Sequence, residues 1–242
     1  HLETTIRFEA DRMTQLILDN TTFEHELEVV KNERRLEVDD SVSGTLHEKL
    51  YALAFDTHPY QWPTIGFMKH LEHMRLIDLQ NFYQRFYTPN NATIVIVGDI
   101  DVLSTLSLLG HYYGKLLPRE VKRRNYAEEP VQVQCKTQEF QRPISSCQIA
   151  IGFHAPSQDK RDAVALDMLN DALVLGESGR LYQRLVLDLE IATDVEASVA
   201  PFAEPGLYDL FISLRSGVDA QRVVDVVQEE LHCLGNTGLS DA

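Results

Sequence analysis

The sequence predicts a folded α+β protein without membrane spans, and each part of this prediction comes from one observation along its 242 residues. Apolar residues make up 44% of the chain and recur in short periodic runs, as they do in folded globular proteins. Consecutive strands and pairs of helices are mixed in each half, which argues against a doubly wound parallel sheet. No apolar stretch approaches the roughly 18 residues of a membrane span, so no membrane insertion is expected.

The first half predicts mainly helices, followed by a strand and one more helix. Thr21 and Glu24 form a capping box that predicts the start of the second helix. Gly98-Asp99 is expected to form the turn between the strand and the last helix of this half. The β-branched run at 92–97 is typical of a buried strand. Apolar residues at helical spacing predict five helices, at about 4–18, 21–39, 47–55, 78–87 and 102–113.

Residues 118–130 are charged, carry proline at both ends and lack apolar periodicity. They are therefore expected to link two domains, 1–117 and 131–242. A pattern of an apolar strand followed by a glycine, an aspartate and an amphipathic helix occurs at 94–112 and again at 210–231. This repetition hints at an internal duplication. The second half predicts strands at 131–140, 147–153, 191–199 and 207–214, and helices at about 162–175, 179–189 and 219–233.

Charge and cysteine content exclude several kinds of site. The net charge of −15 repels phosphate backbones, and no basic stripe offsets it, so nucleic acid is not an expected partner. The chain has three cysteines, Cys135, Cys147 and Cys233. Because no C-x-x-C motif occurs and the number is odd, a thiolate zinc site is not expected. Cys135 and Cys147 could pair across neighbouring strands, but buried free thiols are the favoured interpretation.

Two glutamates on the second predicted helix are candidates for a chemical role. Glu26 and Glu33 are seven residues apart, so on a helix both project from one face, about 10 Å apart along the axis. A zinc–oxygen bond is about 2 Å long, so one ion cannot bind both carboxylates directly. If one of these carboxylates is a zinc ligand, the other must interact with the groups that surround the ligands or with the substrate. The alternative is a solvated acidic face shared with Glu24, Glu28 and Glu37.

Several motifs occur together in one order. The first half carries EADRM at 9–13, E-x6-E at 26–33 followed by Arg34-Arg35, HPY at 58–60 with IG at 65–66, and YTPNNATIVIVGDID at 87–101. In that order these resemble the later part of the zinc-binding domain of the pitrilysin/insulinase family of zinc metallopeptidases, which are inverted zincins. SCQIAIGFHAP, GESGRLYQRLV and EPGLYDLFISL resemble the homologous domain that follows in that family. The resemblance covers nearly the whole chain.

The resemblance implies two homologous, processing-peptidase-like domains, each with an antiparallel-rich sheet packed against helices. In this family H-x-x-E-H supplies two zinc ligands and a general base, and a downstream glutamate is the third ligand. That ligand falls on Glu33, and Glu26 takes the place of a second acidic residue that supports catalysis. The zinc activates a water and polarises the scissile carbonyl of a short, unfolded peptide held in a chamber between two halves.

The sequence departs from the family pattern in two places. No H-x-x-E-H occurs in the 242 residues, and the nearest match, His70-Leu71-Glu72-His73, is one residue too short. Without that motif we expect no catalytic zinc and no activity in this chain, which we interpret as part of a longer protein. Val186 and Thr193 stand where some members have an arginine and a tyrosine, so a second half or partner subunit is expected to supply that pair.

Other interpretations remain open at this point. The chain could belong to a non-catalytic homologue that serves as a substrate-binding or structural subunit of a peptidase complex. An unrelated acidic α+β interaction domain is a third hypothesis. For the peptidase, the expected partners are a peptide substrate and a homologous second half or subunit. Export to a bacterial periplasm is expected only because bacterial members of the family are often exported.

Overall fold

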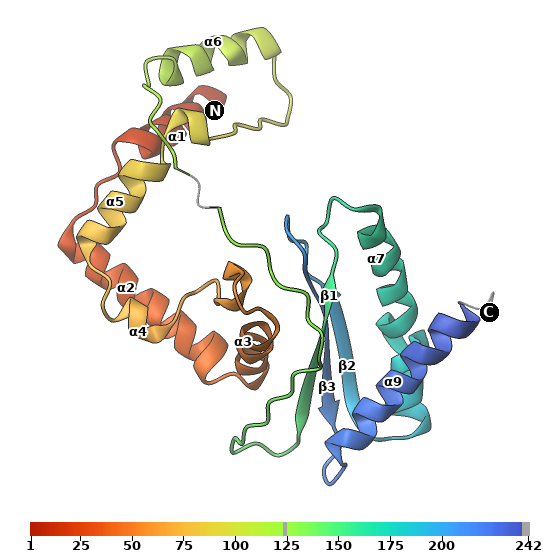
Figure 1. Cartoon of the computed structure of the whole chain (residues 1–242). Helices are drawn as coiled ribbons and strands as arrows, with labels where there is room; N and C mark the ends of the chain where they lie inside the picture. Colours follow the sequence, from red (N-terminus) through yellow and green to blue (C-terminus); the bar gives the residue numbers. More distant parts are fainter. Residues whose placement is uncertain (123–124, 239–242) are drawn as a thin grey trace. The chain divides into compact units, whose positions relative to one another are not determined.

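The computed structural model describes residues 1–122 and 125–238, which form two compact units (Figure 1). The first unit comprises His1–Glu33 and Gly66–Asn125, and the second comprises Arg34–Ile65 and Tyr126–Ala242. Helices and one small antiparallel sheet make up the regular structure of the described residues. The predicted α+β class is therefore confirmed, whereas the division into domains at 118–130 stays a prediction.

The first unit is built from helices. Asp19, and not Thr21, caps the second of them, since its Oδ1 accepts a hydrogen bond from the Thr22 amide at 2.9 Å. In the last helix Asp101 has the same role, accepting from the Ser104 amide. The helices are α1 (Leu2–Thr14), α2 (Asn20–Arg34), which reaches the start of the second unit, α4 (Met68–Leu71), α5 (Leu76–Phe86) and α6 (Val102–Tyr113).

The strand predicted at 92–97 is wrong. These residues form no ladder, and Val95 and Val97 are 79% and 92% exposed. A strand needs a neighbour to receive its backbone hydrogen bonds, and no described segment of the first unit offers one. The repeat predicted at 94–112 consequently has its helix, α6, but not its strand.

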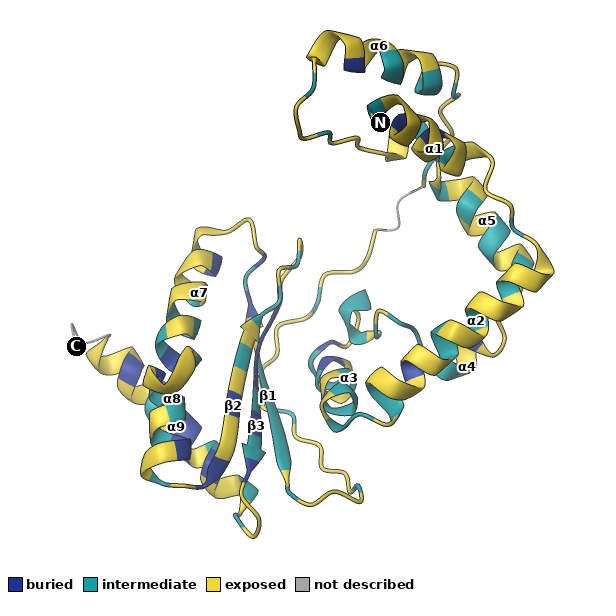
Figure 2. Ribbon diagram, turned by 180° about the vertical axis from the view of Figure 1, so that it is seen from behind, coloured by how far each residue is buried: buried dark blue, intermediate teal, exposed yellow. Residues whose placement is uncertain are grey.

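The second unit contains a three-stranded antiparallel sheet in the order β1-β3-β2 (Figure 1). Helices cover both of its faces, with α3 on one side and α7, α8 and α9 on the other (Figures 1 and 2). The strands are β1 (Gln148–Ala155), β2 (Ala192–Val199) and β3 (Gly206–Leu214), and the helices are α3 (Val42–Ala54), α7 (Arg161–Val174), α8 (Arg180–Tyr182) and α9 (Ala220–Thr237). π-Helical turns follow α2, at Arg35–Asp39, and α8, at Gln183–Asp188.

The central strand β3 is buried on both faces, because its side chains alternate between two apolar clusters (Figure 2). Leu210, Ile212 and Leu214 belong to the larger cluster, with buried residues of α7, α8 and α9. Leu207 points the other way and packs with Tyr51 and Phe55 of the α3 segment. This arrangement holds α3 against one face of the sheet.

The strand predicted at 131–140 is also wrong, since Val131 and Val133 are both 88% exposed and lie in no ladder. Side chains in this segment and next to it instead bind residues 39–58 of the same unit. Lys136 Nζ lies 2.8 Å from Asp56 Oδ1, and Arg142 donates to Thr45 Oγ1 at 2.6 Å. Glu129 accepts hydrogen bonds from the backbone amides of 56–58, the shortest being 2.6 Å.

Candidate functional site

Glu26 and Glu33 both lie on the uninterrupted helix α2, and both side chains are exposed. Seven residues correspond to two turns less 20°, so the two carboxylates project from the same side of this helix. His25, the residue before Glu26, has its Nδ1 3.8 Å from Glu26 Oε1. The structure thus gives two accessible acidic groups on one helix face, while their roles as ligand and catalytic residue stay predictions.

Arg34, directly after Glu33, is buried with a side chain only 6% exposed. Its Nη1 lies 2.7 Å from Glu48 Oε2 on α3, and its Nη2 lies 3.1 Å from Asp39 Oδ1. The hydrogen bond to Glu48 raises the pKa of Arg34, although burial opposes this. These ion pairs lie within the second unit, which begins at Arg34, the last residue of α2.

Sequence reasoning missed this role of Arg34, although the pattern of α2 contains a signal for it. Phe23, Leu27 and Val30 are spaced four and three residues apart, as an apolar helix stripe is, and are partly buried. Arg34 follows Val30 by four residues and continues this stripe. An arginine on an apolar stripe predicts a buried cation with acidic partners.

The described residues do not fit a zinc centre by themselves. No group of three His, Cys, Asp or Glu side chains that could hold a metal occurs among them. His73 of the shortened motif has its Nδ1 2.7 Å from the carbonyl oxygen of Lys69, a contact with the backbone of its own segment. The three cysteines are free and exposed, so the burial predicted for Cys135 and Cys147 is wrong. Glu33 can supply one carboxylate, and zinc needs about three protein ligands.

The two positions that depart from the family pattern also lack catalytic donors in this structure. Val186 is 8% exposed and packs in the larger apolar cluster. The hydroxyl of Thr193 donates to the Ser213 carbonyl oxygen at 3.2 Å, a bond between β2 and β3. Neither side chain can replace an arginine or a tyrosine in holding a substrate backbone or an oxyanion.

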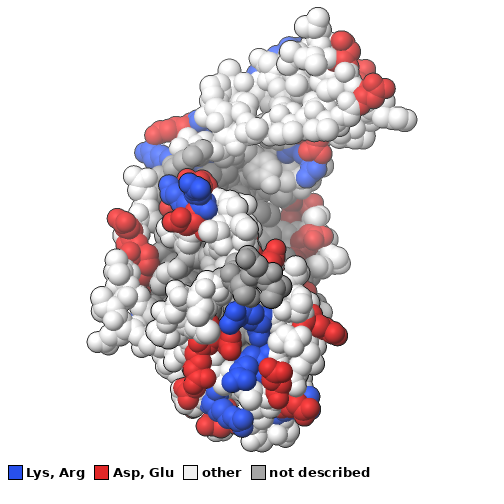
Figure 3. Space-filling model, turned by 90° about the vertical axis from the view of Figure 1, so that its right-hand side faces the viewer, with Lys and Arg blue, Asp and Glu red and all other residues white. Residues whose placement is uncertain are grey.

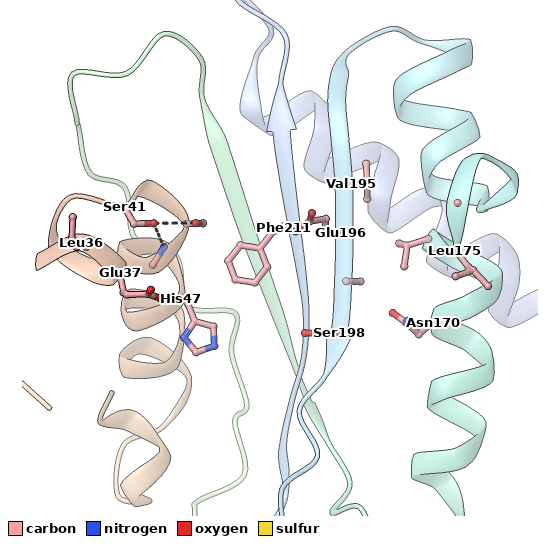
Figure 4. Close-up of a pocket in the computed structure, with 15 residues that line it drawn as sticks. Leu36, Glu37, Ser41, His47, Asn170, Leu175, Val195, Glu196, Ser198 and Phe211 are labelled. Carbon is pink, nitrogen blue, oxygen red and sulfur yellow. Dashed lines mark hydrogen bonds between the residues drawn. The ribbon is translucent and has the colours of Figure 1, made fainter. Parts of the chain in front are cut away.

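A second feature with the dimensions of a binding site lies in the second unit, along β2 (Figure 4). It is an open groove of about 900 Å³, and Glu37 and Glu196 give its lining two carboxylates without any lysine or arginine. Sequence reasoning missed the groove because its walls come from distant segments. The groove is lined by Leu36, Glu37, Ser41, Ser43, Gly44 and His47, by Asn170, Val174, Leu175 and Gly176, and by Val195, Glu196, Ala197, Ser198 and Phe211.

A buried carboxylate fixes β2 to β3 beside this groove. Asp209 on β3 is 2% exposed and accepts a hydrogen bond from Ser198 Oγ at 2.7 Å. Burial raises the pKa of Asp209, although the hydrogen bond from Ser198 opposes that shift. The same environment raises the pKa of Tyr51 on α3, mainly through burial and then through the Asp209 charge. The hydrogen bond from Ser198 to Asp209 therefore joins β2 to the central strand β3.

Comparison with known proteins assigns the family. Residues 74–242 match the family model described as the peptidase M16 inactive domain, which is more than half of the chain. The chain belongs to the M16 peptidases. This confirms the family predicted from the motifs, and the match is to the type of domain that has no catalytic site of its own.

The M16 assignment agrees with individual relatives and solved structures. The zinc protease PqqE of Helicobacter pylori is 31% identical over 189 residues, which cover 77% of this chain and 43% of that protein. A crystal structure of a protease from Helicobacter pylori has a TM-score of 0.92 at 26% identity and covers 99% of this chain and 58% of that one. The periplasmic protease PqqL of Escherichia coli shares the fold, with a TM-score of 0.67 at 18% identity, over 99% of this chain and 27% of its own.

This M16 chain therefore spans about half the length of the Helicobacter proteins that it matches. Across the part of the chain that the structure describes, no helix is both long and apolar enough to cross a membrane. On the face drawn in Figure 3, basic side chains gather in the lower part of the view, with acidic side chains on both sides of them.

Proposed function

We propose that the intact protein is a zinc-dependent metalloendopeptidase that hydrolyses short unfolded peptides in a chamber between two homologous halves. In this proposal Glu33 is the third zinc ligand, and Glu26 is an acidic residue that supports catalysis near the ligands. The observation that carries it is the pair of exposed carboxylates on one side of α2, in a chain whose curated relative is a zinc protease. Residues 1–117 would complete the zinc-binding domain, and 131–242 would form most of the second domain.

The two carboxylates have separate tasks because of their spacing. Glu33 is exposed, so an ion held by donors from elsewhere in the protein can reach its oxygens. Glu26 is about 10 Å away along the helix and cannot share that ion, so it acts on the peptide or on the groups around the ligands. Because the described residues contain no group of three side chains that could hold a metal, the chain alone is expected to be inactive.

A non-catalytic homologue is the second candidate function, and one observation favours it. The family match over 74–242 is to an inactive domain. In that case the chain belongs to a substrate-binding or structural subunit. For either candidate we propose a periplasmic location in a bacterium, supported by the periplasmic protease PqqL, which has the same fold.

The test has a genetic part and a chemical part. Reading the codons upstream of His1 is expected to give H-x-x-E-H, whose absence would contradict an active zinc peptidase. The full-length protein is expected to bind about one zinc per chain by elemental analysis and to cleave quenched fluorescent peptides. Glu33→Ala should lose both the zinc and the cleavage. Glu24→Ala is the matched control, because it removes an exposed glutamate that lies nine residues from Glu33, on the opposite side of α2.

Each candidate predicts a different result. A non-catalytic subunit is expected to contain no stoichiometric zinc and to cleave no peptide, with or without Glu33. Zinc retained in Glu33→Ala would show that another residue is the third ligand. Cleavage lost in Glu26→Gln with zinc retained is the result expected if Glu26 supports catalysis without binding the metal.

A further inference from the structure

A pocket of about 470 Å³ lies within the first unit, where three helices end. The helices α1, α5 and α6 end at Thr14, Phe86 and Tyr113, and the pocket is lined by residues at or shortly after these ends. Its volume is within the range of small-molecule sites, about 300–1,000 Å³. The apolar and aromatic part of the lining consists of Met13, Tyr87, Pro89, Leu116, Leu117 and Pro118.

Two basic side chains, Lys115 and Arg119, also line this pocket, and none of the described lining residues is acidic. The ammonium group of Lys115 has no hydrogen-bonding or ionic partner among the described residues. Arg119 donates from Nη1 to the Gln84 carbonyl oxygen at 2.7 Å, which leaves its Nε and Nη2 without a described partner. An ammonium group and the edge of a guanidinium are the donors that proteins use to bind carboxylates.

The three helix ends offer another explanation for these two cations. The last carbonyl groups of a helix carry partial negative charge, which attracts basic side chains. Arg119 fits this explanation in part, because Gln84 lies in the last turn of α5. Lys115 does not, since its ammonium group contacts no carbonyl oxygen of a described residue. The charge of Lys115 is therefore available to a bound anion.

The wall that carries Arg119 is fixed by hydrogen bonds without any ligand. The amide of Arg119 donates to Asn90 Oδ1 at 3.0 Å and to Thr88 Oγ1 at 3.2 Å. Its carbonyl oxygen accepts a hydrogen bond from Asn90 Nδ2 at 2.9 Å, and Thr88 is only 1% exposed. A wall that is already ordered reduces the entropy that a ligand loses from the protein on binding.

Tyr87 gives the pocket an aromatic surface that is also held in place. Its ring centroid lies 4.7 Å from that of Tyr83, whose hydroxyl donates to the Arg12 carbonyl oxygen at 2.8 Å and accepts from the Leu16 amide. Tyr87 is 45% exposed and Leu117 is 80% exposed, so both have apolar surface that a ligand can cover. An aromatic ring suits this surface because aromatic rings attract one another in offset or edge-on contact.

We propose that this pocket is a binding site for a small aromatic carboxylate. The carboxylate lies between the ammonium group of Lys115 and the unpaired edge of Arg119, and the ring packs against Tyr87 and Leu117. Charge gives the site its preference for acids, and the apolar walls give most of the affinity. This proposal goes beyond the peptidase function and does not depend on it, because Glu33 does not line the pocket.

The first experiment measures binding of three compounds to the full-length protein by ligand-observed NMR at low ionic strength. Phenylbutyrate should bind with a dissociation constant of about 1 mM or lower. Phenylbutanamide, which has the same shape without the charge, should bind about tenfold more weakly, and high salt should reduce this difference. Acetate, which has the charge without the ring, should also bind about tenfold more weakly. Equal affinities for the acid and the amide would assign the cations to the helix ends alone and overturn the proposal.

The second experiment uses variants to place the binding in this pocket. Lys115→Gln should weaken phenylbutyrate binding about threefold and Lys115→Glu about tenfold, while the affinity for phenylbutanamide stays the same. Leu117→Asn should weaken both compounds about threefold. Lys122→Gln, which removes an exposed lysine outside the lining, is the matched control and should bind like the original protein. Thermal unfolding by circular dichroism checks that each variant is folded.

Three results would overturn the proposal. The first is an unchanged affinity for phenylbutyrate in Lys115→Glu, which would place the compound elsewhere on the protein. The second is tighter binding of phenyl phosphate than of phenylbutyrate, which would exclude a site suited to carboxylates. The third is an absence of phenylbutyrate binding at about ten times the expected dissociation constant.

Discussion

Replacing Arg34 with methionine is expected to destabilise the second unit by about 3–5 kcal/mol, the usual cost of removing one partner from a buried ion pair. The estimate applies because the Arg34 side chain is 6% exposed and that of Glu48 is 16% exposed, at a distance of 2.7 Å. Without the guanidinium, the Glu48 carboxylate loses its charge partner in a poorly solvated position. Asp39, whose side chain is 40% exposed, should contribute less, since water can solvate it.

Urea unfolding followed by fluorescence measures this cost in the correct unit, because the single tryptophan of the chain, Trp62, lies in the second unit. Arg222→Met, an exposed position on α9, is the control and should change the free energy of unfolding by about 0.5 kcal/mol or less. Arg34→Met combined with Glu48→Met should recover much of the loss, because it leaves no charge unpaired. A loss below about 1 kcal/mol in the single variant would refute the reasoning.

Two further predictions concern the attachment of a loop and the packing of a helix start. Burial would raise the pKa of Glu129, but the amides of 56–58 and the Thr57 hydroxyl lower it to about 2. The stability that the ionised Glu129 contributes is therefore present above its ordinary pKa of 4.5 and is lost as the pH falls toward 2. The urea midpoint of the unaltered chain should decline between pH 5 and pH 2, and Glu129→Gln should make this decline shallower. A Cβ on Gly44 would lie 1.9 Å from the Glu37 carbonyl oxygen, so Gly44→Ala should lower the free energy of unfolding by about 3 kcal/mol. A Cβ on Gly110 in α6 would have nothing within 4 Å, so Gly110→Ala should raise that free energy by about 0.5–1 kcal/mol. Thermal or urea unfolding measures both changes.

Helices were predictable from the sequence because their determinants are local. The spacing of apolar residues and the capping aspartates lie within the segment itself, as Asp101 shows for α6 and Asp219 for α9. The strands at 192–199 and 206–214 were predictable for a related reason, since they are neighbours along the chain and pair with each other. The β2–β3 pair of the antiparallel sheet follows from these short-range features.

The two wrong strand predictions share one physical cause with the features that were missed, which is dependence on a distant partner. The segments at 92–97 and 131–140 have strand composition, but composition cannot supply the neighbouring backbone that a ladder needs. The burial of Arg34 depends on Glu48, 14 residues away. The groove along β2 depends on segments more than 100 residues apart, from Glu37 to Glu196. Periodicity within one segment can indicate a buried face, as it does for Arg34, but it does not identify the distant segment that packs against that face.

The neighbouring positions of Glu33 and Arg34 explain how one helix end could serve both stability and metal binding. Consecutive helical residues point about 100° apart, so the side chain of Arg34 is buried against Glu48 while that of Glu33 is exposed. The ion pairs of Arg34 hold the backbone that also carries Glu33. Removing the Glu33 carboxylate therefore breaks no buried contact, and Glu33→Ala should leave the urea midpoint of Trp62 fluorescence within about 0.5 kcal/mol of the original. Zinc lost in a variant of unchanged stability would then report on the ligand itself and not on unfolding.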